Sequence, residues 1–398
     1  MVFQRPLCYG GNVLALDTLR RADTWLGWPL AVLLGLWPRR RRALPAAPRE
    51  IAVVKLLGLG SLLTCAGVFR GLRAAQPRAR VTVVTLAGGT EAAARLLPGV
   101  DDVLAVSAAS PGALLCSVWQ VWRELRRRRP DAIVDIEYFS KLSTVFCAAS
   151  GARYRFGFRL PARWRGRLID GGVAFREDIH FRECVARLLA PLGVDYRRLP
   201  AGRIAVPPTA EAAAERLLGA GGDWLALNPH ATSLCLQRRW PLERFAEVAG
   251  ALLQAHPDLR ILVPGSADER PRSEALRVLL PEALRPRVRV LAGETDLPTL
   301  AAVLRRCRLV LTNDTGVMHL ADAVGAPLVA LFGPESTVRY CPAGDPDRTG
   351  VLTGDVPCGP CLSYMNRKRA PCEAEPAACM LAIGVRRVLD ACERILAD

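Results

Sequence analysis

The segment Thr312–Gly316, Thr-Asn-Asp-Thr-Gly, has the residue types of an anion-binding turn. An apolar run precedes it, and a helical pattern that contains His319 follows it. A helix that begins directly after a strand presents unpaired backbone N–H groups and the positive end of its dipole. We therefore predict that Asp314, Thr315, Gly316 and His319 bind a phosphate-bearing ligand. The alternative is structural: Asp314 caps the helix, and His319 packs against the loop.

Polar residues follow two further apolar runs in the same half of the chain. Thr232 leads to the paired guanidinium groups of Arg238 and Arg239, which can hold phosphate oxygens. Ser266 and Glu269 offer a hydroxyl and a carboxylate for a ribose or a base. Together with the first turn, these loops predict a nucleotide that carries a diphosphate. The alternative for the arginine pair is a solvated basic loop.

Two carboxylates near the middle of the chain are candidates for acid–base chemistry. Asp135 and Glu137 lie in and after the apolar run 132–136, and Glu137 stands at its carboxyl end. A carboxylate at that place can take a proton from a hydroxyl group that attacks as a nucleophile. Glu137 and Asp135 are therefore candidates for such acid–base chemistry. The alternative for Glu137 is an ordinary polar loop residue.

Short apolar runs that alternate with helical patterns must position these residues. Such alternation predicts parallel sheets covered by helices, with ligands at the carboxyl ends of the strands. The expected strands form two series, 51–55, 81–86, 103–106 and 132–136, then 224–227, 261–263, 288–291, 309–312 and 328–332. We therefore predict an α/β protein with two domains, 49–205 and 206–398, and a cleft between them.

Residues 1–48 differ from the rest of the chain. They contain the apolar run Trp25–Trp37, followed by the four arginines Arg39–Arg42. Thirteen helical residues rise about 20 Å, which is less than the hydrocarbon thickness of a bilayer. Tryptophans that flank leucines beside a basic cluster favour a segment that lies in a membrane interface. The alternative is a helix packed on the protein's own surface.

Four of the thirteen cysteines are grouped near the C-terminus, at Cys358, Cys361, Cys372 and Cys379. A Cys-x-x-Cys pair followed by two more cysteines can place four thiolates around one zinc ion. Two disulfides, or reduced thiols without a ligand, are the alternatives. We predict a structural zinc site here, and no cofactor for catalysis.

The chain has 398 residues and a net charge of +16, with 51% hydrophobic residues. This composition excludes a mostly disordered chain, and the lengths of the apolar runs exclude a protein with many membrane spans. All but three of the 54 basic residues are arginine, a bias that base composition can explain. We therefore expect no nucleic-acid partner. With no secretory signal before the scattered cysteines, a reducing, cytoplasmic compartment is expected.

Several motifs in their order resemble glycosyltransferase family 9, the ADP-heptose:lipopolysaccharide heptosyltransferases. They are Lys55 with Gly58-Leu-Gly60, then Arg-Arg-Trp-Pro, Gly-Ser-x-x-Glu, Thr-Asn-Asp-Thr-Gly-x-x-His-Leu and Leu-Phe-Gly-Pro. The resemblance covers about residues 50–395. It implies a GT-B fold, two Rossmann-like domains with the acceptor on the first and the nucleotide sugar on the second. It also implies metal-independent transfer that inverts the anomeric centre.

By this resemblance, Thr315, Gly316 and His319 hold the diphosphate, and Asp314 lies near the sugar. Arg238 stands where the family usually has a lysine. The implied donor is a nucleotide-diphosphate sugar, with ADP-heptose favoured. The implied acceptor is an anionic, lipid-linked or lipopolysaccharide-type molecule, which places the protein on the inner face of the cytoplasmic membrane.

The chain departs from the family pattern at Ser61, where the family usually has an aspartate that acts as general base. A serine hydroxyl has no useful basicity near pH 7. Either Glu137 has taken over as general base, with Asp135 as the second choice, or the acceptor differs, or activity is lost. Two alternative functions follow, a catalytically silent GT-B binding protein and an enzyme similar to UDP-sugar epimerases.

Overall fold

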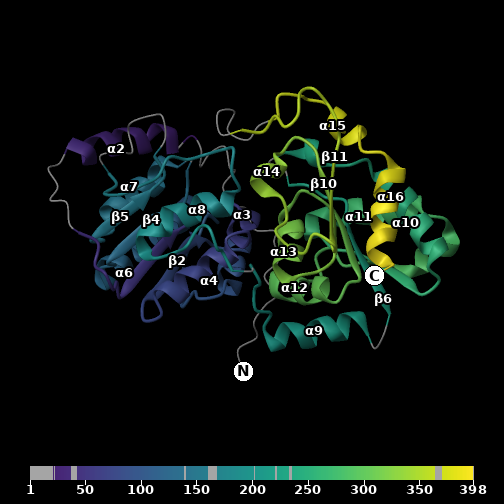
Figure 1. Ribbon diagram of the computed structural model, residues 1–398, viewed down its shortest axis with the longest axis horizontal. Coiled ribbons are helices and arrows are strands. Elements are labelled where there is room, and N and C mark those ends of the chain that lie inside the picture. The colour runs from purple at the N-terminus through teal and green to yellow at the C-terminus, as the bar shows by residue number, and fades with distance from the viewer. Residues whose placement is uncertain are drawn as a thin grey trace. The chain divides into compact units, whose positions relative to one another are not determined.

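The chain folds into two compact units, which meet in sequence between Gly202 and Arg203. The computed structural model describes residues 21, 23–36, 43–138, 140–159, 168–200, 202–219, 222–232, 235–363 and 370–397. Each unit contains one parallel sheet with helices around it (Figure 1). The prediction of two parallel α/β units is confirmed.

The N-terminal unit has a five-stranded sheet in the order β3-β2-β1-β4-β5. Its strands are β1 (Glu50–Val54), β2 (Arg80–Leu86), β3 (Asp102–Val106), β4 (Ala132–Asp135) and β5 (Tyr154–Gly157). Its helices are α2 (Gly27–Leu36), α3 (Leu59–Leu63), α4 (Ala66–Ala75), α5 (Gly89–Leu96), α6 (Pro111–Arg128), α7 (Lys141–Ala149) and α8 (Phe181–Leu189), with the 3₁₀ turn η2 (Ala190–Leu192).

The C-terminal unit has a six-stranded sheet in the order β11-β10-β9-β6-β7-β8. Its strands are β6 (Asp223–Asn228), β7 (Leu259–Val263), β8 (Val288–Val290), β9 (Leu309–Asn313), β10 (Leu328–Phe332) and β11 (Thr349–Thr353). Its helices are α9 (Pro208–Leu218), α10 (Leu242–Ala255), α11 (Arg270–Leu279), α12 (Leu297–Arg305), α13 (Gly316–Val324), α14 (Thr337–Tyr340), α15 (Ala378–Leu381) and α16 (Val385–Leu396). Its 3₁₀ turns are η3 (Leu236–Arg238), η4 (Ala267–Glu269) and η5 (Glu282–Arg287).

Both sheets reverse their strand order at one place. In the N-terminal sheet the reversal lies between β1 and β4, and in the C-terminal sheet between β6 and β9. Loops leave the carboxyl ends of such a strand pair in opposite directions, which opens a crevice for ligands. The candidate residues at 55–61, 135–137, 228–232 and 312–316 all lie at or directly after the carboxyl ends of these four strands. The topology therefore brings together, within each unit, segments that are about 80 residues apart in sequence.

The structure contains two strands that the apolar runs did not predict, β5 and β11. Both lie at a sheet edge, where Arg155 and Gly157 interrupt the apolar run of β5 and half-exposed residues interrupt that of β11. After β1 the chain forms two helices, α3 and α4, with a turn between them.

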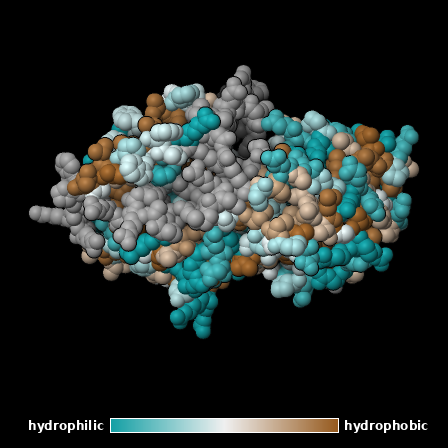
Figure 2. All heavy atoms as spheres, turned by 90° about the horizontal axis from the view of Figure 1, so that it is seen from above, coloured by the Kyte–Doolittle hydropathy of each residue, from teal (hydrophilic) through white to brown (hydrophobic). Residues whose placement is uncertain are grey.

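Helix α2 packs on α7 in the N-terminal unit. Hydrophobic atoms reach the surface at the end of this unit where Figure 1 places α2 (Figure 2). None of the described helices combines the length and the hydropathy that crossing a membrane requires. Trp37 and Arg39–Arg42 of the predicted interface segment lie outside the described residues.

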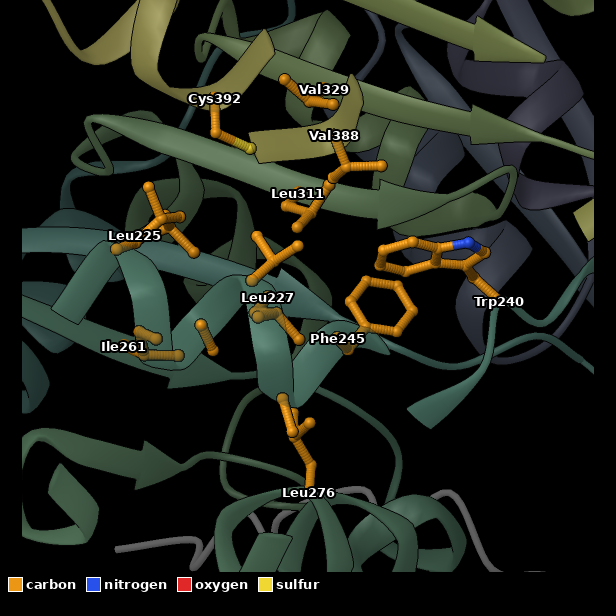
Figure 3. Close-up of a cluster of buried hydrophobic side chains, with 14 of the residues drawn as sticks. Leu225, Leu227, Trp240, Phe245, Ile261, Leu276, Leu311, Val329, Val388 and Cys392 are labelled. Atoms are coloured by element: carbon orange, nitrogen blue, oxygen red, sulfur yellow. The ribbon is translucent and has the colours of Figure 1, made fainter. Parts of the chain in front are cut away.

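The main core of the C-terminal unit lies between its sheet and two helices, α10 and α16. Leu225, Leu227 and Leu311 extend from β6 and β9 toward Phe245 of α10 and Val388 of α16 (Figure 3). These strands are buried on both faces, which explains why they read as continuous apolar runs. The core holds the strand ends in fixed places, so the polar loops after them have a rigid support.

Candidate active site

Asn228 links the two strands at the reversal of the C-terminal sheet. It ends β6, and its side-chain amide donates to Thr312 Oγ1 at 2.8 Å and to Thr315 Oγ1 at 3.0 Å. Asn313, at the end of β9, donates to the His230 carbonyl at 3.1 Å and accepts from the Trp240 N–H at 3.2 Å. The two asparagines thus fix three loops around one strand pair.

Thr315 is the residue before α13, but its side chain does not cap the helix. Its hydroxyl oxygen accepts from Asn228 instead, which leaves the hydroxyl proton to be donated elsewhere. The first-turn N–H groups, which begin at Gly316, receive no side-chain cap. Backbone N–H groups, a hydroxyl proton and a helix dipole together suit a phosphate oxygen.

Arg238 lies between two buried carboxylates. Its Nη2 is 2.9 Å from Glu335 Oε2, and its Nε is 3.5 Å from Asp314 Oδ2. Burial by itself would lower the pKa of Arg238, but Asp314 and Glu335 outweigh it and raise that pKa. The guanidinium therefore stays charged and is held in one place, while part of it remains exposed.

Two buried atoms of this ion pair have no hydrogen-bond partner, Arg238 Nε and Asp314 Oδ2. Buried polar atoms normally have one, so these atoms mark a place where a ligand can complete the network. Asp314 does not act as the helix cap that the structural alternative proposed, since α13 has no side-chain cap and the carboxylate faces Arg238. A sugar hydroxyl can donate to this oxygen.

Glu335 is a residue of this site that sequence reasoning did not select. It follows β10, the neighbour of β9, and its second oxygen accepts from the Ser336 N–H at 3.0 Å. The segment Gly333-Pro-Glu335 after an apolar run was the available signal. His319 is buried in α13, with its ring edge-on to Tyr340 at 6.2 Å between centroids. A contact between His319 and a donor stays a prediction.

The remaining loop residues surround the same strand ends. Arg239 pairs with Glu375 at 3.0 Å, and Thr232 is exposed. Ser266 and Glu269 form a reciprocal capping box at η4, in which the Ser266 N–H donates to Glu269 Oε2 at 2.8 Å. This structural use occupies one carboxylate oxygen of Glu269. Binding of a ribose or base by Ser266 and Glu269 stays a prediction.

His230 is a second residue that sequence reasoning did not select. It is buried after β6, and its Nε2 lies 3.0 Å from Ser273 Oγ. Burial, followed by the charges of Arg272 and Arg239, lowers its pKa to about 3. The imidazole is therefore neutral at physiological pH and serves as a polar support for the loop.

In the N-terminal unit, Ser61 lies in the short helix α3, and its hydroxyl donates to the Gly58 carbonyl at 2.8 Å. Gly58 has φ 91°, a left-handed conformation that favours glycine. A β-carbon at Gly58 would lie 2.6 Å from Ser61 Oγ and 3.7 Å from Lys55 Nζ. The turn therefore brings Ser61 and the Lys55 ammonium close together.

Glu137 joins this turn from β4, which pairs directly with β1. Its Oε1 accepts from Lys55 Nζ at 3.0 Å and from the Leu57 N–H at 2.7 Å. Both side chains of the ion pair are buried, with 4% of Lys55 and 7% of Glu137 exposed. Glu137 therefore lies beside the Gly58–Ser61 turn. Its role as a base stays a prediction.

Asp135 is fully buried and cannot meet an acceptor hydroxyl at its present position. Its oxygens accept from Ser143 Oγ, from Thr144 Oγ1 at 2.8 Å and from the Glu137 N–H at 3.1 Å. Asp135 thus fixes the start of α7 and the backbone of Glu137. Asp135 was predicted as the second candidate for the general base. The structure instead favours a positioning role for this carboxylate.

The four C-terminal cysteines lie near one another. Burial, followed by the thiols of Cys372, Cys379 and Cys358, raises the pKa of Cys361 to about 11. Within the described ranges, no group of three or more His, Cys, Asp or Glu side chains has a geometry that could hold a metal ion. The zinc site therefore stays a prediction.

The chain matches the model of glycosyltransferase family 9 (heptosyltransferase) over residues 118–370, more than half of its length. A lipooligosaccharide heptosyltransferase 2 of Haemophilus influenzae is 39% identical over 108 residues, which are 27% of this chain and 31% of that relative. The chain thus spans about a third of the length of this relative.

Solved structures show the same fold at low sequence identity. The Escherichia coli ADP-heptose LPS heptosyltransferase II has a TM-score of 0.70 and 20% identity, covering 87% of this chain and 98% of that one. An E. coli heptosyltransferase with ADP-2-deoxy-2-fluoro heptose has a TM-score of 0.61 and 20% identity, covering 77% and 93%. The GT-B prediction is thereby confirmed for the two α/β units. The chain belongs to glycosyltransferase family 9.

Proposed function

We propose that the chain transfers a heptose from ADP-heptose to a lipid-linked, lipopolysaccharide-type acceptor, with inversion at the anomeric carbon. The proposal rests on the structure at the N-terminus of α13. Its N–H groups have no side-chain cap, and the Arg238 guanidinium is fixed nearby through Asp314. This arrangement suits a leaving diphosphate. The solved relative with a fluorinated ADP-heptose binds a ligand of this class.

In the proposed reaction, the bond between the anomeric carbon and the diphosphate oxygen breaks as the acceptor oxygen bonds to that carbon. Arg238 and the α13 N-terminus meet the negative charge that develops on the diphosphate. Asp314, with an unpartnered oxygen, accepts from a hydroxyl of the sugar. The acceptor proton passes to Glu137 on the N-terminal unit, where Ser61 orients the hydroxyl.

The same proposal places the protein at the cytoplasmic face of the membrane that contains its acceptor. An acceptor with a lipid anchor stays in the bilayer, so the enzyme must reach it there. Exposed tryptophans at Trp25 and Trp28 support this location, because tryptophan is typical of membrane interfaces.

Transfer can be tested with purified protein, heptose-deficient lipopolysaccharide and a panel of ADP-, GDP- and UDP-sugars. We expect ADP release that depends on the acceptor and is greatest with ADP-heptose. A protein that binds ADP-sugars without any transfer would be a silent binding protein, an alternative that Ser61 favours. Interconversion of free UDP-sugars without an acceptor would instead indicate an epimerase.

A further inference from the structure

Helix α2 exposes an unusual amount of apolar surface. Gly27 and Ala31, one turn apart, are its buried residues. Large side chains elsewhere around the segment are exposed, led by Trp25 (78%), Leu36 (66%) and Leu33 (63%). A helix that is apolar all round is normally covered on all sides. Within the described part of this unit, only the side of α2 that carries Gly27 and Ala31 is covered, so its exposed side suits another apolar environment.

The structure fixes α2 to the start of α7. Asp23 Oδ1 accepts from Ser140 Oγ and from the Leu142 N–H, both at 2.8 Å. A β-carbon at Gly27 would lie 2.7 Å from Lys141 Cβ, so glycine allows the close approach. Because α7 starts just after Glu137, α2 lies at the carboxyl edge of the N-terminal sheet.

Helix α6 adds a second exposed apolar site on the same side of this sheet. Val121 and Leu125 of α6 share one core cluster with Cys147 of α7, which shows that both helices cover the same face. One turn apart on the outer surface of α6, Leu115 is 72% and Trp119 52% exposed. These two exposed apolar residues lie in the first half of α6, which begins after the carboxyl end of β3.

Nearly all of the net positive charge of the chain lies in residues 11–202. Residues 11–202 contain 30 Lys and Arg against 15 Asp and Glu, whereas residues 203–398 contain 23 of each. Arg123 places its guanidinium 4.8 Å from the centre of the exposed Trp119 ring. A positive, aromatic-rich surface attracts anionic lipid headgroups while its apolar side chains enter the interface.

We infer that α2 and the outer face of α6 form one docking surface for a bilayer that contains anionic phospholipid. This inference rests on the proposed function and adds the surface that reaches the acceptor. A lipid-linked acceptor in that bilayer would lie at the sheet edge that carries Glu137 and Ser61. Charge complementarity and the interfacial tryptophans favour a membrane over a protein partner.

The test uses the full-length protein and sedimentation with vesicles, without any sugar nucleotide. Vesicles are made of phosphatidylcholine, with or without about 30% phosphatidylglycerol. One variant carries Trp25→Ser and Trp28→Ser, and a second carries Leu115→Ser and Trp119→Ser. The matched control, Val278→Ser with Leu279→Ser, removes an exposed apolar pair from α11 of the C-terminal unit. Thermal unfolding of each variant checks that it is folded.

We expect the parent to bind anionic vesicles at least about tenfold more tightly than neutral ones, and less tightly in high salt. Each α2 or α6 variant should lose about tenfold in binding to anionic vesicles, while the control binds like the parent. A parent that stays in the supernatant with anionic vesicles at low salt would overturn the inference. So would α2 and α6 variants that bind as the parent does.

A failure of this inference is distinguishable from a failure of the proposed function. Heptose transfer to a water-soluble, deacylated acceptor reports the proposed function alone, and the variants should retain it. Transfer to acceptor embedded in vesicles should fall with vesicle binding.

Discussion

Asn228 and Thr315 are hydrogen-bonded across the strand reversal of the C-terminal sheet, although 87 residues separate them in sequence. The amide donates to the threonine hydroxyl and so occupies the oxygen that would otherwise cap α13. The consequence is a helix start whose N–H groups face outward without a side-chain partner. A ligand phosphate can take the place of the missing cap.

Gly316→Val should weaken ADP binding. A branched side chain at the first residue of α13 keeps phosphate away from the N–H groups, and each charge-assisted hydrogen bond lost costs about 1.5–3 kcal/mol. Calorimetric titration with ADP should show a Kd at least about tenfold higher. Gly384→Val is the matched control, since Gly384 precedes α16 and has open space around it. Equal affinity in Gly316→Val and the parent would place the diphosphate elsewhere.

Arg238→Gln should reduce both ADP affinity and stability. It removes the cation between Asp314 and Glu335, and leaving buried carboxylates without their partner costs up to about 3 kcal/mol. Arg238→Lys should lose less of both, because it keeps the charge but not the planar fork. Urea unfolding and ADP titration measure the two effects. Arg277→Gln, which breaks an exposed pair with Glu274, should change neither ADP affinity nor stability. An equal loss in this control would contradict the role of Arg238 in ADP binding.

The sequence was sufficient to predict the strands that are buried on both faces, because each is a continuous apolar run. It could not show which strands are neighbours. Lys55 and Glu137, 82 residues apart, meet only because β1 pairs with β4. Glu335 and His230 were missed for a related reason, since their partners Arg238 and Ser273 come from other loops. Edge strands such as β5 lacked the apolar signal.

His230 should make the stability of the parent depend on pH below about 6.5. Its pKa is lowered to about 3 in the folded chain, so the unfolded chain binds the proton first as the pH falls. The contribution of the neutral His230 ring to the free energy of unfolding is fully present above about pH 6.5, and it is lost as the pH falls toward 3. Between pH 6.5 and 5, the parent should lose about 2 kcal/mol more than His230→Gln.

Urea unfolding at several pH values measures this difference. If the free energies of unfolding of the parent and of His230→Gln changed equally with pH, His230 would not be neutral and buried in solution.

We predict that the four C-terminal thiols bind one zinc ion per chain. Four thiolates suffice for a closed structural site. Metal analysis of protein prepared with zinc under reducing conditions should therefore give a ratio near one, and Cys361→Ser or Cys379→Ser should reduce it strongly. Cys116→Ser, an exposed cysteine on α6, serves as the control. Absence of metal from the parent would leave reduced thiols as the correct alternative.

Glu137→Gln separates a general base from a structural partner of Lys55. The amide oxygen can still accept from Lys55 and Leu57, so the turn should keep its shape. The amide cannot take a proton, so kcat should fall about 10²–10⁴-fold with donor affinity unchanged. The part of the pH–rate profile that requires an ionised carboxylate should disappear with it.

Asp135→Asn is the matched control for this change. Asp135 accepts hydrogen bonds from Ser143 and Thr144 at the start of α7, so its loss should lower stability and leave the shape of the pH–rate profile intact. Ser61→Asp in the Glu137→Gln background should restore part of kcat, since the family usually has its base at that position. A Glu137→Gln enzyme at the parental rate would show that the carboxylate only positions Lys55. The proton would then leave by another route, and the ion pair would be the reason that the turn keeps its geometry without an aspartate at position 61.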